Sequence, residues 1–454
     1  MTSQRRMMKL GAFLPAPGHH VAAWRLPRSH PAGVLDFDYY RRLVQTAERG
    51  KFDLIFLSDG AGVRTSYRNA DELSRQGRMV HFEPLTLLSA LAVHTTHIGL
   101  TATASTSYNE PFNIARKFAS LDHLSGGRSG WNAVTSATDA EARNFNLDHQ
   151  YDHASRYHRA REFMEVVTGL WDSWEDDAFL YDRESGRFFD PDKLHILGHK
   201  GEHFSVRGPL NVARPPQGHP VIVQAGSSPD GRDFAGRWAE VVFTAQQTLD
   251  GAQAYYRSIK EHAARHGRAA EDIKVLPGAC ILVAPTRAEA EDKYAALQDL
   301  IDPVVGLGLL TGQLGDVDIS GFPLDEQLPE LPVTEGSTSK QQLIYEQARR
   351  EHLTVRQLYL KVASSRGHRF LLGTPGTIAD QLEDWFRNEA ADGFNLMPDY
   401  LPGGLDDIVS LLVPELQRRG LMRTEYEGRT LRENLGLRRP DFSSTTTGTP
   451  GDGS

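Results

Sequence analysis

The segment at residues 98–136 constrains the fold most, because a strand, a helix and a second strand follow one another there. Residues 98–102 are apolar and rich in threonine, as a buried parallel strand should be. Pro111 suits the first turn of the helix, and residues 128–134 form the next strand. Hydroxyl side chains follow both strands, where parallel barrels carry their chemistry. Any one of these hydroxyls could instead only satisfy loose backbone groups.

Strand and helix patterns alternate along most of the chain. Eight strand-helix units in order predict an α/β fold, a (β/α)8 TIM barrel with insertions at its carboxyl-terminal rim. The expected strands are 10–15, 53–58, 98–102, 128–134, 220–226, 241–245, 273–283 and 394–397. The expected helices include 36–49 with Asp36 as its cap, 84–94, 153–174, 249–266 and 377–388.

Two segments exceed the bare repeat. Residues 176–219 form a polar excursion that could hold a small hairpin, and residues 301–373 end in two plausible helices around 339–364. We expect the second insertion to fold as a mobile lid over the mouth of the barrel, because a structureless loop of that length is rare. We predict a single domain over residues 1–437 and a disordered tail over 438–454.

Composition excludes several classes of protein. The chain has 454 residues and a formal net charge of -9, so it offers no basic field for nucleic acid. Cys280 is the single cysteine, which excludes an internal disulfide and suggests a buried thiol in a reducing compartment. We find neither an export signal nor an apolar run long enough to span a membrane. A cytoplasmic protein is expected.

The strongest local motif runs from residue 224 to 237, QAGSSPDGRDFAGR. An apolar strand ends there, Ser227 and Ser228 follow, and Pro229 begins a helix. Free backbone N–H groups and the helix dipole favour a phosphate at such a junction, and the two hydroxyls add donors. Ser228 alone is explained equally well as a helix cap without any ligand. Phosphates in barrels are commoner after the seventh and eighth strands, so both interpretations stay open.

A second polar cluster lies at residues 148–163, DHQYDHASRYHRAREF. If a helix begins at His153, then Tyr157 lies one turn further on the same face and Arg156 is adjacent. His149 and His153 also have the i, i+4 spacing of metal ligands, but zinc needs three or four converging ligands, and the segment has no cysteine or HExxH pattern. We therefore expect no metal, and an anionic, aromatic ligand suits this cluster better.

Four segments resemble the flavin-dependent monooxygenases of the bacterial-luciferase-like superfamily. They are residues 98–136, FLSDG at 56–60, HASRY at 153–157 and VIVQAGSSPDGRDFA at 221–235. The resemblance extends to about residue 435. It is to the branch represented by nitrilotriacetate monooxygenase component A, dibenzothiophene sulfone monooxygenase and the large subunit of pristinamycin synthase.

This resemblance implies roles for individual residues. The residues that line the isoalloxazine side of FMN in such enzymes match Asp59, Thr103 and Asn132. Those that hold the ribityl chain and phosphate match His153, Tyr157, Ser227 and Ser228, with Arg156 helping to neutralise the phosphate. The substrate side of the ring would be faced by Phe13, His20, Phe56 and Phe243, although the three phenylalanines could equally be plain barrel packing.

The resemblance also implies a reaction. Reduced FMN (FMNH2) reacts with O2 to give a flavin peroxide, at C4a or N5, which transfers one oxygen atom to a small organic substrate while the other leaves as water. The protein must then exclude water and orient the ring. A neutral histidine or an amide could donate a hydrogen bond to the peroxide, and His20 and Asn132 are the candidate catalytic residues.

No GxGxxG follows an expected strand at the start of a helix, so we expect no nicotinamide site in this chain. A separate NAD(P)H:FMN reductase would supply FMNH2, and a homodimer or homotetramer is expected. The alternatives are a deazaflavin-dependent dehydrogenase, a non-catalytic flavin-binding protein of the same barrel, and a flavin-independent lyase or isomerase. The last would need a lysine at a strand end, which we do not find. No strong cationic cluster is apparent that would select a polycarboxylate substrate.

Overall fold

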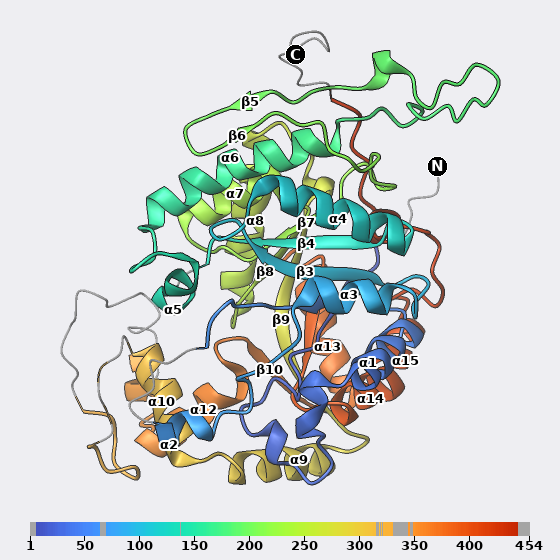
Figure 1. The fold of residues 1–454 in the computed structure, drawn as a ribbon. Helices are drawn as coiled ribbons and strands as arrows, with labels where there is room; N and C mark the ends of the chain where they lie inside the picture. The colour runs from blue at the N-terminus through green and yellow to red at the C-terminus, as the bar shows by residue number, and fades with distance from the viewer. Residues whose placement is uncertain are drawn as a thin grey trace.

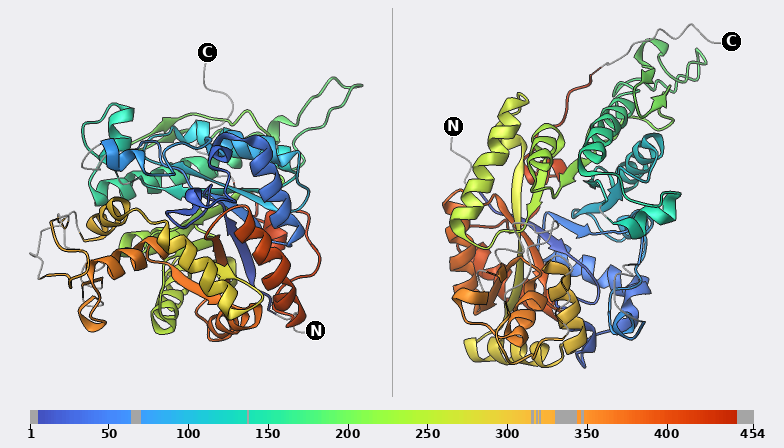
Figure 2. Two further views of the ribbon diagram at one scale, coloured as in Figure 1. Left: turned by 90° about the horizontal axis from the view of Figure 1, so that it is seen from below. Right: turned by 90° about the vertical axis from the view of Figure 1, so that its left-hand side faces the viewer.

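The computed structural model describes residues 6–63, 70–136, 138–314, 317, 319, 321–329, 344–345 and 348–443. Eight parallel strands close into a barrel with helices around it, which confirms the expected (β/α)8 fold (Figures 1 and 2). All eight strands fall where the sequence predicts them. In barrel order they are β1 (Lys9–Phe13), β2 (Leu54–Leu57), β3 (Gly99–Ser105), β4 (Ser129–Val134), β7 (Val221–Gln224), β8 (Val241–Thr244), β9 (Lys274–Val283) and β11 (Gly393–Pro398), which pairs with β1.

Helices follow the strands as the repeat requires. The Asp36 carboxylate accepts hydrogen bonds from the backbone N–H groups of Asp38 and Tyr39, so it caps the first helix as expected. The main helices are α1 (Phe37–Arg49), α3 (Pro84–Ala92), α4 (Pro111–Ser125), α6 (His153–Trp171), α7 (Pro229–Trp238), α8 (Leu249–Arg265), α9 (Arg287–Asp299) and α13 (Pro375–Arg387). Shorter ones are α2 (Ala70–Ser74), α5 (Asp139–Ala142), α14 (Gly403–Asp407), α15 (Val413–Arg418) and α16 (Leu431–Leu435).

The base of the barrel is plugged by α16. Leu431 and Leu435 are fully buried in one cluster with barrel side chains that include Leu54, Val223 and Leu276. A Cβ placed on Gly99, at the start of β3, would lie 2.4 Å from a methyl carbon of Leu431. Because α16 closes the amino-terminal end of the barrel interior, a ligand would enter this interior from the carboxyl-terminal rim.

The first insertion, residues 176–219, runs along one side of the barrel and extends beyond it (Figure 1). It contains the expected small hairpin, in which β5 (His199–Lys200) pairs antiparallel with β6 (Ser205–Val206). Tyr181 and Phe188, early in this excursion, are 63% and 62% exposed.

The second insertion has a hydrophobic core of its own. It contains α10 (Pro303–Gln313), α12 (Val355–Ser365) and β10 (Arg369–Gly373). The two helices pack together, and Leu310 and Leu358 belong to one buried cluster. Of the two helices expected around 339–364, one is confirmed as α12, whereas residues 330–343 and 346–347 lie outside the described residues.

Strand β10 was not expected from the sequence. It pairs with residues 279–283 of β9, while residues 274–277 of the same long strand pair with β8. The insertion thus returns to the barrel as part of its wall.

The first residues of the expected tail are held against the barrel. Arg438 pairs with Asp272, and the carbonyl oxygen of Pro440 accepts a hydrogen bond of 3.0 Å from Arg214. Residues 444–454 lie outside the described residues. No helix in the described part of the chain is long and apolar enough to cross a membrane.

Candidate active site

Thr103 and Asn132 meet at the carboxyl ends of β3 and β4, where the strand register sets them side by side. The Thr103 hydroxyl donates to the carbonyl oxygen of Leu57 at 3.0 Å and accepts from the Asn132 amide nitrogen at 2.9 Å. Asn132 is 3% exposed, and its Oδ1 atom has no hydrogen-bond partner. An unused buried acceptor of this kind needs an explanation, and a ligand N–H group at the barrel mouth supplies one.

Arg156 is tied to the loop that follows β4. Its guanidinium donates to the Ser136 carbonyl oxygen at 2.5 Å, and the Ser136 hydroxyl donates to Glu141 at 3.1 Å. Glu141 also accepts from the backbone N–H of Ala61 at 3.3 Å, so it joins this loop to the loop after β2. Glu141 was not predicted from the sequence. An acidic residue at the start of a short helix has no local sequence signal that would identify it as a link between two distant loops.

Asp59 follows β2 and lines a cavity of about 320 Å³ at this rim. Its Oδ1 atom lies 3.7 Å from Nδ1 of His81. Burial raises the pKa of Asp59, and the neighbouring His81 partly opposes this effect. Asp59 therefore holds its proton more readily than a surface aspartate.

The amino-terminal end of α7 has the backbone geometry of an anion site. A Cβ on Gly226 would lie 2.9 Å from Cα of Gly231 and 3.0 Å from the Tyr157 hydroxyl, so glycine alone fits there. Ser228 caps the helix by accepting from the Gly231 N–H at 3.1 Å, as the ligand-free interpretation requires. Tyr157 is buried and Ser227 is exposed beside it, and neither hydroxyl hydrogen-bonds to the rest of the described chain. These open donors fit a phosphate.

The histidines near the start of α6 do not share a metal site. His153 pairs with Asp230 at 3.3 Å, whereas His149 pairs with Asp139 at 3.3 Å. The His153 ring lies 5.0 Å from the Tyr157 ring, so these two groups do adjoin as expected. Elsewhere, three largely exposed groups have potential metal-ligating atoms within 4.8 Å of one another, and they lie on α6 and the β5–β6 hairpin: His158, Glu202 and His203.

Three phenylalanines form a row inside the barrel. The Phe13 and Phe56 rings are 4.9 Å apart, and the Phe56 and Phe243 rings are 4.6 Å apart, both edge to face. All three belong to the cluster that fills the barrel interior. Phe13 is the least buried of the row, so it carries the apolar surface towards the rim.

His20 is engaged within the protein. Its Nδ1 atom accepts from the Ala22 N–H at 3.2 Å, and its Nε2 atom lies 3.4 Å from Gln298 of α9. Burial lowers the pKa of His20 to about 4, so the ring is neutral at pH 7. His19, which the sequence analysis passed over, is equally buried, and neither of its ring nitrogens makes a hydrogen bond of normal geometry. The sequence could not show which of His19 and His20 has ring nitrogens without a normal hydrogen bond, because the direction of a side chain in a loop has no sequence signal.

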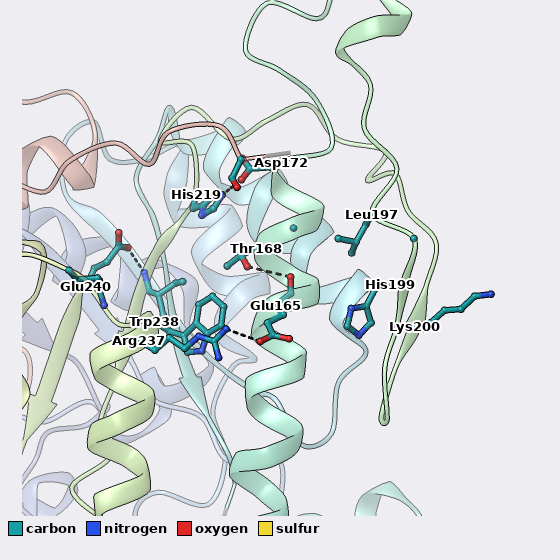
Figure 3. Close-up of a pocket in the computed structure, with 15 residues that line it drawn as sticks. Glu165, Thr168, Asp172, Leu197, His199, Lys200, His219, Arg237, Trp238 and Glu240 are labelled. Atoms are coloured by element: carbon teal, nitrogen blue, oxygen red, sulfur yellow. Dashed lines mark hydrogen bonds and ion pairs between the residues drawn. The ribbon is translucent and has the colours of Figure 1, made fainter. Parts of the chain in front are cut away.

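A larger cavity lies away from all these residues. It measures about 830 Å³ and lies between α6, α7 and the β5–β6 hairpin, where Arg237 and Glu165 pair at 2.8 Å (Figure 3). Its lining includes Ile222 at the start of β7, which places it on the outside of the barrel, towards its base. The convergent unused donors and acceptors are at the opposite end of the strands, and that rim is the candidate site.

The chain is similar to known oxygenases over nearly its whole length. A family model described as luciferase-like monooxygenase matches residues 14–392. The chain is 52% identical to N-acetyl-S-(2-succino)cysteine monooxygenase of Bacillus subtilis, over 97% of this chain and 99% of that protein. It is also 52% identical to nitrilotriacetate monooxygenase component A of Aminobacter aminovorans, over 96% of this chain and 98% of that protein.

Solved structures agree with this similarity. EDTA monooxygenase from Chelativorans sp. BNC1 superposes with a TM-score of 0.82 at 34% identity, covering 96% of this chain and 100% of that one. A riboflavin lyase solved with modified FMN and riboflavin superposes with a TM-score of 0.82 at 31% identity, covering 95% and 96%.

Proposed function

The chain belongs to the luciferase-like monooxygenase family and is a flavin-dependent monooxygenase, and we propose that its flavin is FMN, received in reduced form from a separate NAD(P)H:FMN reductase. The observation that carries the choice of FMN is the glycine-lined amino-terminal end of α7, where Tyr157 and Ser227 leave their hydroxyls open. A phosphate-bearing flavin uses such a site, whereas riboflavin has no group for it.

In this proposal the two clusters at the rim hold opposite ends of FMN. The phosphate and ribityl end lies against His153, Tyr157, Ser227 and Ser228, with Arg156 nearby as a positive charge. The ring end lies against Asp59, Thr103 and Asn132. The unused Oδ1 atom of Asn132 would accept a hydrogen bond from a ring N–H group, which satisfies the buried acceptor.

Reduced flavin supplies the two electrons that let O2 give one oxygen atom to the substrate and the other to water. The chain's own residues orient the ring and exclude water. The row of Phe13, Phe56 and Phe243 offers an apolar surface on the substrate side, and the insertion with α10 and α12 covers the mouth as a lid. Neutral His20 remains a candidate donor together with Asn132, provided that its Nε2–H group exchanges the 3.4 Å contact with Gln298 for the reacting group, and His19, whose ring nitrogens make no hydrogen bond of normal geometry, is a further candidate.

Two relatives are named for nitrilotriacetate and N-acetyl-S-(2-succino)cysteine, which both carry carboxylates. Carboxylate-bearing compounds are therefore candidate substrates of this chain. To test the function, we would combine the chain with FMN, NADH, an added FMN reductase and these compounds under isotopically labelled O2. We expect a product that contains one labelled oxygen atom. Product formation without O2 would show a dehydrogenase, and absence of flavin binding would exclude the proposal.

A further inference from the structure

We infer that the cavity at the ends of β1 and β2 is a carboxylate subsite, in which Arg78 and Arg366 bind an anionic group of the substrate. The inference rests on the proposed function and narrows its substrate class. The cavity is lined from the barrel side by residues such as Leu14 and Asp59, and from the second insertion by Leu309 and Arg366. Barrel rim and lid therefore share it.

The inference rests first on the buried guanidinium of Arg78. Its guanidinium donates to the carbonyl oxygen of Gly18, and it pairs with no carboxylate in the described ranges of the chain. Burial lowers the pKa of Arg78, and the positive charge of Arg366 lowers it further. An arginine still keeps its charge in a protein, so the Arg78 guanidinium, buried beside a second positive charge and without a carboxylate partner in the described ranges, calls for an anion.

His19 lies beside the two arginines, on the side of the aromatic row. Its ring lies 5.8 Å from the His368 ring and 6.1 Å from the Phe13 ring. Burial lowers the pKa of His19, and the charges of Arg78 and Arg366 act in the same direction. A neutral ring there can donate one hydrogen bond without adding another charge. The basic cluster thus adjoins the aromatic row, so one molecule can contact both.

The FMN phosphate is the obvious rival occupant, but the site that we propose for it lies elsewhere in the barrel. In the closed barrel β7 is four strands from β1, on the opposite side of the ring. The anion site at α7 follows β7, whereas the cavity follows β1 and β2. An anion bound at Arg78 would therefore be a second one, which the substrate must supply. No strong cationic cluster is apparent in the sequence, because Arg78 and Arg366 are far apart along the chain and come together only in the folded structure.

The test compares Arg78→Gln and Arg366→Gln with the matched control Arg287→Gln, which removes an exposed arginine of α9. Calorimetry on the FMN-loaded chain would measure affinity for nitrilotriacetate and N-acetyl-S-(2-succino)cysteine, and for their methyl esters. Losing a hydrogen bond to a charged group should raise the Kd of the acids roughly 10- to 150-fold. We expect the control to bind like the parent, and the esters to bind the parent weakly.

The inference is overturned if both glutamine variants keep the parent's affinity for the acids, or if the parent binds the esters more tightly than either acid. If Arg78→Gln fails to fold, the affinities of Arg366→Gln and Arg78→Lys for the acids test the inference instead. Lysine keeps the positive charge but cannot make the bidentate hydrogen bonds of arginine. The FMN affinity of every variant is measured alongside. Normal FMN binding and oxygen use with lost acid binding support the subsite, whereas failure of FMN binding in the parent would count against the proposed function instead.

Discussion

The affinity of the chain for FMN should depend on two hydroxyls at the start of α7. We consider the substitutions Tyr157→Phe and Ser227→Ala, each of which removes one oxygen atom. Neither hydroxyl has a partner elsewhere in the described part of the chain, so their removal leaves no internal hydrogen bond broken. Ser228 is different, because its hydroxyl caps α7, and Ser228→Ala would also cost about 1 kcal/mol of helix stability.

The size of the effect follows from burial. A hydrogen bond to a charged group contributes roughly 1.5 to 3 kcal/mol. Tyr157 is 6% exposed, so water competes little and the upper half of that range applies, whereas exposed Ser227 belongs to the lower half. The double variant should lose roughly 4 to 5 kcal/mol of FMN binding before non-additivity.

Titration of flavin fluorescence would measure these losses, with riboflavin as the comparison ligand. Riboflavin lacks the phosphate, so it should bind the double variant and the parent about equally. Tyr181→Phe, on the exposed excursion, is the matched control and should change neither affinity. If the folded double variant binds FMN as tightly as the parent does, the phosphate lies elsewhere and our assignment of α7 is refuted.

Three further predictions concern the partner, the lid and the scaffold. The purified chain with FMN should not oxidise NADH until an FMN reductase is added, and rapid NADH loss without one would contradict a two-component system. Removing residues 312–334, of which 315, 316, 318, 320 and 330–334 lie outside the described residues, should leave FMN binding intact but raise hydrogen peroxide release per reduced flavin; unchanged coupling would make this insertion purely structural. Asp392 is buried, which opposes its charge, yet its ion pair with Lys260 at 2.9 Å and the Val275 N–H hold its pKa below the usual value. Chemical denaturation should show Asp392→Asn destabilised by about 3 to 5 kcal/mol at pH 7. In the parent, the free energy of unfolding that ionised Asp392 contributes is fully present well above pH 3.8. It is lost as the pH falls through 3.8 towards the lowered pKa of Asp392 in the folded protein. Equal stability of variant and parent at pH 7 would refute the stabilising role of Asp392.

The barrel could be predicted from the sequence because its strands are buried on both sides. Such strands are continuous apolar runs, and segments like 273–283 stand out without any knowledge of their neighbours. Strand β10 escaped because Arg369–Gly373 is short, partly exposed and enclosed in an insertion with no regular repeat. Its pairing depends on the unusual length of β9, which only the folded barrel reveals.

The site was predictable to a smaller extent. Hydroxyl and amide groups at strand ends predict a shared rim, and the meeting of Thr103 with Asn132 agrees with that reasoning. The meeting of Arg78 with Arg366 could not be foreseen, because one lies before α3 and the other at the end of α12. Nothing in either segment indicates the other. Contacts of that kind arise from tertiary packing, which periodicity and spacing do not encode.

The double pairing of β9 has a consequence for how such enzymes diverge. The segment between β9 and β10, which consists of α9 and the second insertion, leaves β9 at residue 283 and returns to the same strand as β10, so one strand fixes both ends of the segment. For a loop anchored in this way, doubling the length costs only about 0.6 kcal/mol of closure entropy. Evolution can thus lengthen, shorten or exchange the segment while the flavin side of the barrel stays intact. We expect chimaeras cut after residue 283 and before residue 369 to fold, and to inherit part of the substrate preference of the donor.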